Sequence, residues 1–170
     1  MEYVKLGEIC KIRTGKLDAN ASSTDGLYPF FTCSKEPLRI DSYSYDCECV
    51  LVAGNGDLNV KYYNGKFDAY QRTYIIEVNN KTEFDTRYIY LLIDSKIGEL
   101  RNKSIGGVIK YIKLGDLTDI GIPKLSLVEQ QIIIDNSFKL NDLISLKEKQ
   151  INKLDELIKS QFVKEVYLWN

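Results

Sequence analysis

Polar and aromatic side chains gather beside turn residues at several places in this sequence, and their types suit contacts with a polyanion. Lysines, hydroxyls and glycine amides can position phosphates, whereas arginine, glutamine and asparagine can make paired hydrogen bonds to base edges. The competing interpretation is that the glycines only form turns and the tyrosines only fill a small core. The clusters are Thr32-Cys33-Ser34-Lys35, Gly54-Asn55-Gly56-Asp57, Lys61-Tyr62-Tyr63-Asn64-Gly65-Lys66, Ala69-Tyr70-Gln71-Arg72-Thr73 and Gly106-Gly107-Val108-Ile109-Lys110-Tyr111.

Enzyme chemistry has little support in the residue types. The sequence contains no histidine, which excludes Ser/His/Asp and Cys/His nucleophile pairs and nearly all catalytic zinc sites. Asp94-Ser95-Lys96 matches the Asp-x-Lys half of a nuclease site, but it falls on a predicted helix. The four cysteines include no Cys-x-x-Cys pair, so we expect buried small apolar side chains rather than a metal or redox site. Carboxylate or lysine chemistry remains possible, but these residue types single out no catalytic residue and no metal or cofactor ligand.

Composition and charge narrow the class of protein. With 44% hydrophobic and 28% charged residues, the 170-residue chain is typical of a globular protein. No apolar run reaches membrane-spanning length and no targeting signal is evident, so we expect a cytoplasmic protein with reduced thiols and no membrane partner. The net charge of −1 means that any polyanion must be held by a local basic cluster whose compensating acids lie elsewhere.

The elements that must position these clusters follow two sequence patterns, one rich in strands and one helical. Together they predict an α+β fold. We expect a meander of strands at 50–53, 58–63 and 73–78, with Asn64-Gly65 as a two-residue hairpin turn. A helix at 85–100 and short strands at 105–112 and 119–122 should follow. These elements form a sheet-rich domain over residues 1–125, and a different pattern begins at residue 126.

Residues 126–170 predict one long amphipathic helix. Ser126-x-x-Glu129 is a capping box, and neither proline nor glycine follows it. From 127 to 168, at ~1.5 Å per residue, this helix is about 60 Å long, too long to bury its apolar face on a small domain. We expect it to pair as a coiled coil in an antiparallel homodimer. The apolar stripe at heptad-like spacing is Leu140, Ile144, Ile151, Leu154 and Ile158.

Seven motifs in order resemble the specificity subunit of type I restriction-modification systems, over nearly the whole chain. Ser126 stands where that family often has proline, and the capping box explains why this departure is harmless. The motifs are Val4-Lys5-Leu6-Gly7-Glu8-Ile9, Gly15, Tyr28-Pro29-Phe30-Phe31-Thr32, Leu51-Val52-Ala53-Gly54-Asn55-Gly56, Asn64-Gly65-Lys66-Phe67-Asp68-Ala69-Tyr70-Gln71-Arg72-Thr73, Gly106-Gly107-Val108-Ile109-Lys110-Tyr111-Ile112 and Ile122-Pro123 with Leu127-Val128-Glu129-Gln130-Gln131.

The resemblance implies a non-catalytic subunit that reads double-stranded DNA. In that family a target recognition domain reads one half of a bipartite site, and the helix after it is a spacer that docks methyltransferase subunits. This chain resembles half of the usual subunit, which implies a homodimer that reads an interrupted palindrome. Restriction subunits are possible further partners, and S-adenosylmethionine, ATP and Mg²⁺ would be bound by partner subunits.

The same resemblance suggests which residues contact DNA. Arg72 and Gln71 are the first candidates for base or phosphate contact, and Tyr70 for stacking or wedging. The candidate phosphate contacts, with their neighbours on adjacent loops, are Lys66, Lys110, Lys103, Ser34, Lys35 and Asn55.

Two alternatives stay open. One is an interaction protein or decoy that docks on methyltransferase through its helix without reading DNA. The other is an enzyme with carboxylate or lysine chemistry, such as the nuclease triplet. Retention of Gln71, Arg72, Lys110 and the glycine loops favours the DNA-reading interpretation.

Overall fold

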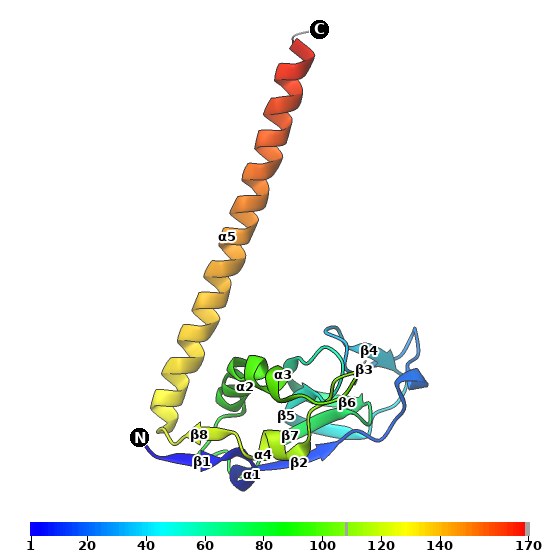
Figure 1. The fold of residues 1–170 in the computed structure, drawn as a ribbon, viewed down its shortest axis with the longest axis vertical. Helices are drawn as coiled ribbons and strands as arrows, with labels where there is room; N and C mark the ends of the chain where they lie inside the picture. Colours follow the sequence, from blue (N-terminus) through cyan, green and yellow to red (C-terminus); the bar gives the residue numbers. More distant parts are fainter. Residues whose placement is uncertain (108, 169–170) are drawn as a thin grey trace. The chain divides into compact units, whose positions relative to one another are not determined.

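The computed structural model describes the backbone of residues 1–107 and 109–168, with side chains up to residue 163 (Figure 1). The chain divides into two compact units, Met1–Gln131 and Ile132–Asn170. Its elements are β1 (Tyr3–Lys5), α1 (Leu6–Ile9), β2 (Cys10–Thr14), the 3-10 helix η1 (Ala19–Ala21), β3 (Tyr28–Phe31), β4 (Leu38–Ile40), β5 (Tyr45–Ala53), β6 (Val60–Ala69), β7 (Thr73–Val78), α2 (Thr86–Ser95), α3 (Ile97–Lys103), α4 (Leu114–Thr118), β8 (Gly121–Pro123) and α5 (Leu127–Leu168).

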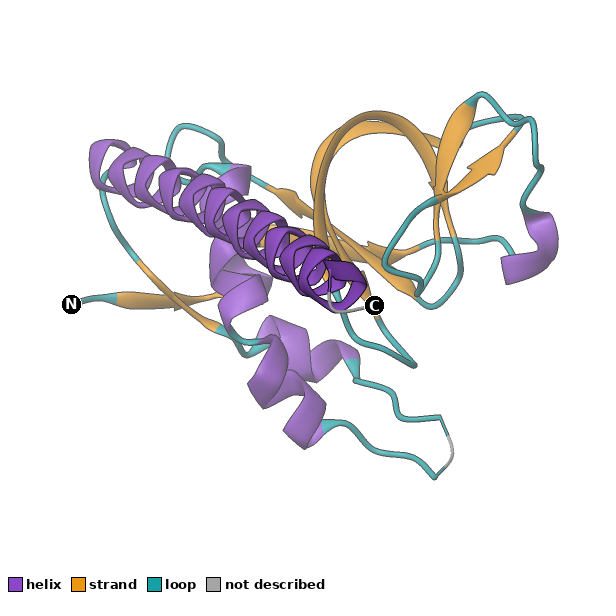
Figure 2. Cartoon of the chain, turned by 90° about the horizontal axis from the view of Figure 1, so that it is seen from above, coloured by secondary structure: helices purple, strands orange, loops and turns teal. Residues whose placement is uncertain are grey.

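A six-stranded sheet in the order β2-β7-β5-β6-β3-β4 dominates the first unit. All neighbours are antiparallel except β3 and β6, which pair in parallel. The sheet curls strongly (Figure 2). The segment after β2 thereby reaches the end of β6, where the Leu17 amide donates to the Ala69 carbonyl at 3.4 Å and the Gln71 amide donates to the Leu17 carbonyl at 2.9 Å.

Aromatic and aliphatic side chains fill one face of this curled sheet. Phe67 lies at the centre, with its ring centroid 5.5 Å from that of Phe31 and 5.3 Å from that of Tyr45. Offset and edge-on ring pairs of this kind add stabilisation beyond the burial of their area. The buried cluster comprises Phe31, Tyr45, Cys49, Leu51, Phe67, Ala69 and Ile75.

The helices of the first unit pack around this sheet. Helix α2 contacts β5 and β6, and it buries Tyr88, Ile89 and Ile93 completely. A small antiparallel sheet of β1 and β8 joins the two ends of this unit, and α1 contacts α4 beside it. Residues distant in sequence therefore form one core, and the predicted α+β class is confirmed.

The predicted hairpin at Asn64-Gly65 is wrong. Strand β6 continues through both residues and pairs with β5. The paired residues run from Tyr45 opposite Phe67 to Val52 opposite Val60. The long ladder outweighs the local turn preference because each added strand pair satisfies backbone groups and buries side chains. Gly65 has a φ of 135°, a conformation that glycine adopts without steric cost, so the strand can bend there without ending.

Other predicted elements differ in extent. Strand β7 matches the predicted 73–78, whereas the predicted helix at 85–100 is two helices that break at Lys96. The predicted strand at 105–112 includes Val108, which lies outside the described residues. Its described part forms no strand; it is a loop closed by hydrogen bonds between the backbones of Ile105 and Tyr111. The predicted strand at 119–122 overlaps β8 only at residues 121 and 122.

The long helix is confirmed as α5, with 42 residues. The Ser126 amide donates to the Glu129 carboxylate at 2.8 Å, and the Glu129 amide donates to the Ser126 hydroxyl at 3.4 Å, which is the predicted capping box. Across the described residues, no helix combines the length and apolar character needed to cross a membrane. The predicted boundary between 125 and 126 stays a prediction.

Candidate nucleic-acid interface

Four loops meet at the end of the curled sheet where β5 ends and β7 begins. We call this group the loop cluster: residues 32–35, 54–59, 70–72 and the described part of 105–111. The Gly54 amide donates to the Arg72 carbonyl at 2.8 Å, and the Gly56 amide donates to the Lys110 carbonyl at 3.0 Å. The sulfur of Cys33 lies 2.8 Å from Oδ1 of Asn55. Backbone and side-chain hydrogen bonds therefore join loops that are far apart in sequence.

Gly54 is required by the close approach of these loops. A Cβ at this position would lie 2.5 Å from the Arg72 carbonyl oxygen and 2.9 Å from the ring of Tyr74. Contacts this short with backbone oblige the chain to move, so only glycine lets the turn at 70–72 pack against the end of β5. The hydroxyl of Tyr74 donates to the Ile112 carbonyl at 3.2 Å, which holds the end of the 105–111 segment against the sheet.

The loop cluster displays cations without acidic partners. Lys35, Arg72 and Lys110 are exposed, and among the described residues none of them forms an ion pair. By contrast, Arg101 at the edge of the cluster is paired with Asp57 at 2.8 Å. Uncompensated cations on rigid loops can contact phosphates and base edges. This local imbalance answers the objection raised by the net charge of −1.

Gln71 and Tyr70 lie in the cluster but are engaged within the chain. The Gln71 side-chain amide donates to the Asp18 carboxylate at 2.6 Å, so its geometry is held from the loop after β2. Tyr70 is half-buried, and its backbone amide donates to the Phe31 carbonyl at 2.9 Å. The turn therefore presents Arg72 from a fixed backbone.

Lys61 and Asn59 support the loop cluster. The sequence placed Lys61 in one of the polar clusters, but it named neither residue as a DNA contact. The Lys61 ammonium donates to the Ser34 carbonyl at 2.7 Å and to Oδ1 of Asn59. Asn59 in turn donates to the Cys33 carbonyl at 2.9 Å. Burial lowers the pKa of Lys61. These contacts fix the backbone that carries Ser34 and Lys35, and only the folding of β6 beneath the 32–35 loop reveals them.

Lys66 lies away from the loop cluster. It is opposite Asp46 near the start of β5, with its ammonium 4.7 Å from the centroid of the Tyr43 ring. The interaction with Tyr43 raises the pKa of Lys66. The loop cluster lies beyond Ala53, at the other end of the same strand. The structure therefore does not bring Lys66 together with Arg72.

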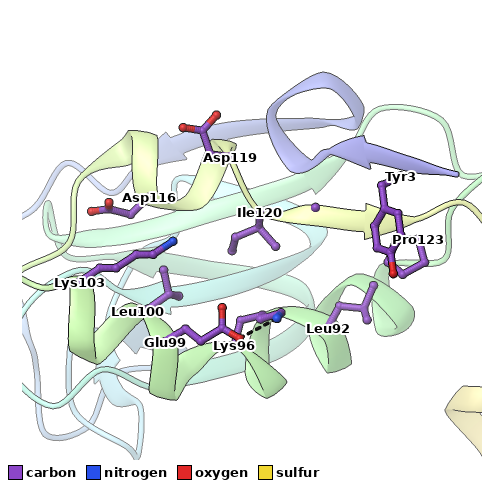
Figure 3. Close-up of a pocket in the computed structure, with 11 residues that line it drawn as sticks. Tyr3, Leu92, Lys96, Glu99, Leu100, Lys103, Asp116, Asp119, Ile120 and Pro123 are labelled. Atoms are coloured by element: carbon purple, nitrogen blue, oxygen red, sulfur yellow. Dashed lines mark hydrogen bonds and ion pairs between the residues drawn. The ribbon is translucent and has the colours of Figure 1, made fainter. Parts of the chain in front are cut away.

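Lys103 is also separate from the loop cluster, and charged side chains of both signs surround it. It lines a cavity of about 390 Å³ between α3, α4 and β8, together with Lys96, Glu99, Asp116 and Asp119 (Figure 3). Glu99 pairs with Lys96 at 2.7 Å, and Asp119 pairs with Lys5 at 2.8 Å. Asp116 is a further acid in this lining, so Lys103 does not lie in a cluster of uncompensated cations. The geometry of this cavity therefore gives no support to Lys103 as a phosphate contact.

The cysteines are divided between core and surface. Cys10 and Cys49 are buried as predicted, and burial raises the pKa of the Cys10 thiol to about 12. Thiols of this kind are chemically inert at neutral pH. The prediction is wrong for Cys33 and Cys47, which are partly exposed. Asp94-Ser95-Lys96 lies at the end of α2, where Lys96 pairs with Glu99 at 2.7 Å.

The second unit offers a different kind of surface. Along α5 the predicted stripe residues are all exposed, from 53% at Ile144 to 66% at Ile158. Leu140, Ile151 and Leu154 are exposed to 57–59%. An amphipathic helix with so much exposed apolar area is typical of a surface for another helix.

Comparison with known proteins defines the class. A family model described as the type I restriction modification DNA specificity domain matches residues 1–156, so the chain belongs to this family. The resemblance seen in the sequence motifs is thereby confirmed.

Particular relatives agree with this assignment. The chain is 44% identical over 155 residues to the type I restriction enzyme EcoDI specificity subunit of Escherichia coli. The matched region covers 91% of this chain and 33% of that protein. The fold is similar to the type I restriction-modification S subunit of M. genitalium, with a TM-score of 0.72 at 19% identity over 85% of this chain and 41% of that one. A second solved chain, from a structure that describes complex assembly of the type I R-M system, has a TM-score of 0.69 and is 17% identical. That match covers 93% of this chain and 43% of the solved chain. The chain therefore spans a third of the E. coli relative's length and less than half of either solved chain.

Proposed function

We propose that this chain is a DNA-sequence specificity module that reads one half of a bipartite target for a type I restriction-modification system. The observation that carries the proposal is the loop cluster, in which Lys35, Arg72 and Lys110 lack acidic partners among the described residues. The family assignment supports it independently. The module would act on double-stranded DNA in the cytoplasm.

The roles of the side chains follow from their chemistry. Arg72 sits on a turn whose backbone is held by Gly54, and a guanidinium can bind the two acceptors of guanine in the major groove. Lys35 and Lys110 suit phosphates on either side, with Ser34 and Asn55 on the adjacent loops. Gln71 would reach a base only by exchanging its bond to Asp18. The chain contains no histidine, and in this proposal methylation and cleavage belong to partner subunits that bind S-adenosylmethionine, ATP and Mg²⁺.

We further propose that two copies pair through α5 and dock methyltransferase subunits, and possibly restriction subunits, along the paired helices. The exposed Leu and Ile residues of the stripe support pairing because their area would be covered by an equivalent helix. A twofold axis would then present two identical domains to an interrupted palindrome.

Sequencing of modified bases in the host, with and without this gene, tests the function directly. We expect one methylated motif to disappear with the gene, and we expect that motif to be an interrupted palindrome. An unchanged set of methylated motifs would contradict DNA reading and favour the decoy alternative. A motif with two different halves would contradict the homodimer but leave DNA reading in place.

Substitution of Arg72 tests the site. Arg72→Ala should weaken binding to the methylated motif by about 1–3 kcal/mol if the guanidinium contacts a base, and binding to unrelated duplexes by less. Arg39→Ala is the matched control because Arg39 is exposed on β4, outside the loop cluster, and the change in charge is the same. Fluorescence anisotropy with both duplexes measures the effect. Equal losses for both variants would exclude a specific role for the loop cluster.

A further inference from the structure

The segment between α3 and α4 exposes apolar side chains inside the loop cluster. Ile109 is 62% exposed, and Ile105 and Tyr111 are exposed as well. Single exposed apolar residues are common on protein surfaces, whereas several on one short loop are typical of a contact surface. This apolar group lies among the cations of the loop cluster, so the same partner should cover both.

Hydrogen bonds fix the base of this loop. The Ile105 amide donates to the Tyr111 carbonyl at 3.0 Å, and the Tyr111 amide donates to the Ile105 carbonyl at 2.8 Å. Gly106 has a φ of 123°, and a Cβ there would lie 2.5 Å from the Ile109 carbonyl oxygen. Glycine at this position therefore lets the chain return tightly to Ile109. The exposed side chain is carried by a loop whose two ends are held together.

The loop shares its support with the turn that carries Arg72. The Gly54 amide donates to the Arg72 carbonyl at 2.8 Å, and the Gly54 carbonyl accepts from the Ile112 amide at 3.0 Å. The Gly56 amide donates to the Lys110 carbonyl at 3.0 Å. The turn after β5 thus holds both loops next to each other, and a duplex bound at one of them is within reach of the other.

The base edges of DNA offer one kind of apolar group to such a side chain. In the major groove the bases present hydrogen-bond donors and acceptors, and their one apolar substituent is the C5-methyl group of thymine. In the proposed function Arg72 binds guanine in this groove, so the neighbouring loop meets the same groove. Lys110 is exposed and forms no ion pair among the described residues, which suits a phosphate beside Ile109.

We propose that Ile109 is a specificity-determining residue that packs against the C5-methyl group of a thymine in the half-site. This inference rests on the proposed function. The contact adds apolar recognition to the hydrogen bonds of Arg72 and selects thymine at one position of the target. Burial of one methyl group strengthens binding about fourfold, which sets the size of the expected effect.

Replacement of thymine by uracil tests the contact, because uracil lacks only the C5-methyl group. The duplexes carry the motif that sequencing of modified bases identifies, with deoxyuridine at each thymine of the half-site in turn. In fluorescence anisotropy, wild type should bind one of these duplexes about fourfold more weakly than the thymine duplex. Ile109→Ser should lose this difference at that position, whereas Ile109→Val, which stays apolar, should keep it.

Leu27→Ser is the matched control for the loss of an exposed apolar side chain. Leu27 is 75% exposed and precedes β3, whereas the loop cluster begins after the other end of this strand. This variant should show the wild-type difference between thymine and uracil.

The outcomes separate this inference from the proposed function. Equal binding of wild type to the thymine and uracil duplexes at every position, a half-site without thymine, or a difference that persists in Ile109→Ser would overturn the inference while DNA reading stands. Unchanged DNA binding by Ile109→Ser, with loss of methyltransferase binding, would overturn it in favour of a protein contact. Wild type that does not prefer the motif to an unrelated duplex would contradict the proposed function itself.

Discussion

The two units of this chain bury the same kinds of residues to opposite extents. In the first unit, Phe67 and Ile75 are fully buried, whereas along α5 Leu140 and Ile151 are more than half exposed. The first unit satisfies its apolar residues internally through contacts between distant strands. The second has only its own helical backbone, and the stability of an isolated helix depends on packing of its apolar face. This difference in burial is the basis for the proposal that a second helix covers the apolar stripe of α5.

The largest expected effect comes from the core of the first unit. Phe67→Ala should cost about 3–5 kcal/mol of unfolding free energy because the ring lies among Phe31, Tyr45 and Tyr63. Phe138→Ala is the matched change on α5, where the ring is 49% exposed, and it should cost far less. Thermal unfolding followed by near-ultraviolet circular dichroism measures both. Equal losses of unfolding free energy for the two variants would contradict the difference in packing between the units.

Pairing of α5 should fail when its stripe is charged. Ile144→Asp combined with Ile151→Asp should weaken self-association about 100-fold, or roughly 2.7 kcal/mol, because carboxylates would have to be desolvated in the helix interface. Lys149→Asp produces the same change in net charge on the face opposite the stripe and should leave association intact. Light scattering across a concentration series reports the result. A monomeric wild type at micromolar concentration would contradict helix pairing.

A smaller effect on the stability of the first unit should appear at acidic pH. The hydrogen bond from Arg87 lowers the pKa of the Asp85 carboxyl in the folded state. Since the folded pKa lies below the unfolded one, this group stabilises the protein above the ordinary pKa of aspartate, and the contribution is lost as pH falls through the folded pKa. Asp85→Asn should therefore reduce the dependence of the melting temperature on pH between about 5 and 2. Parallel curves for both proteins would exclude Asp85 as a source of acid sensitivity.

Elements governed by local chemistry were predictable. The capping box at Ser126 and Glu129, the unbroken helix after it and strand β7 follow from short-range patterns that the structure repeats. The family motifs located the loops that bear Arg72 and Lys110. The surroundings of Lys66 and Lys103 could not be predicted, since the sequence does not show which lysine lies against the Tyr43 ring or which lines the cavity beside α3.

By itself, the sequence determined the α+β class, the long capped helix with its apolar stripe and the absence of histidine chemistry, because each depends on residue type and short-range spacing. The tertiary structure alone decided that Asn64-Gly65 continues a strand, that Gly54 brings the turn at 70–72 against β5, and that Gln130 joins α5 to α2. These features depend on pairs of residues far apart in the chain. Their energies are gained only when these distant segments have come together, and no local pattern encodes them.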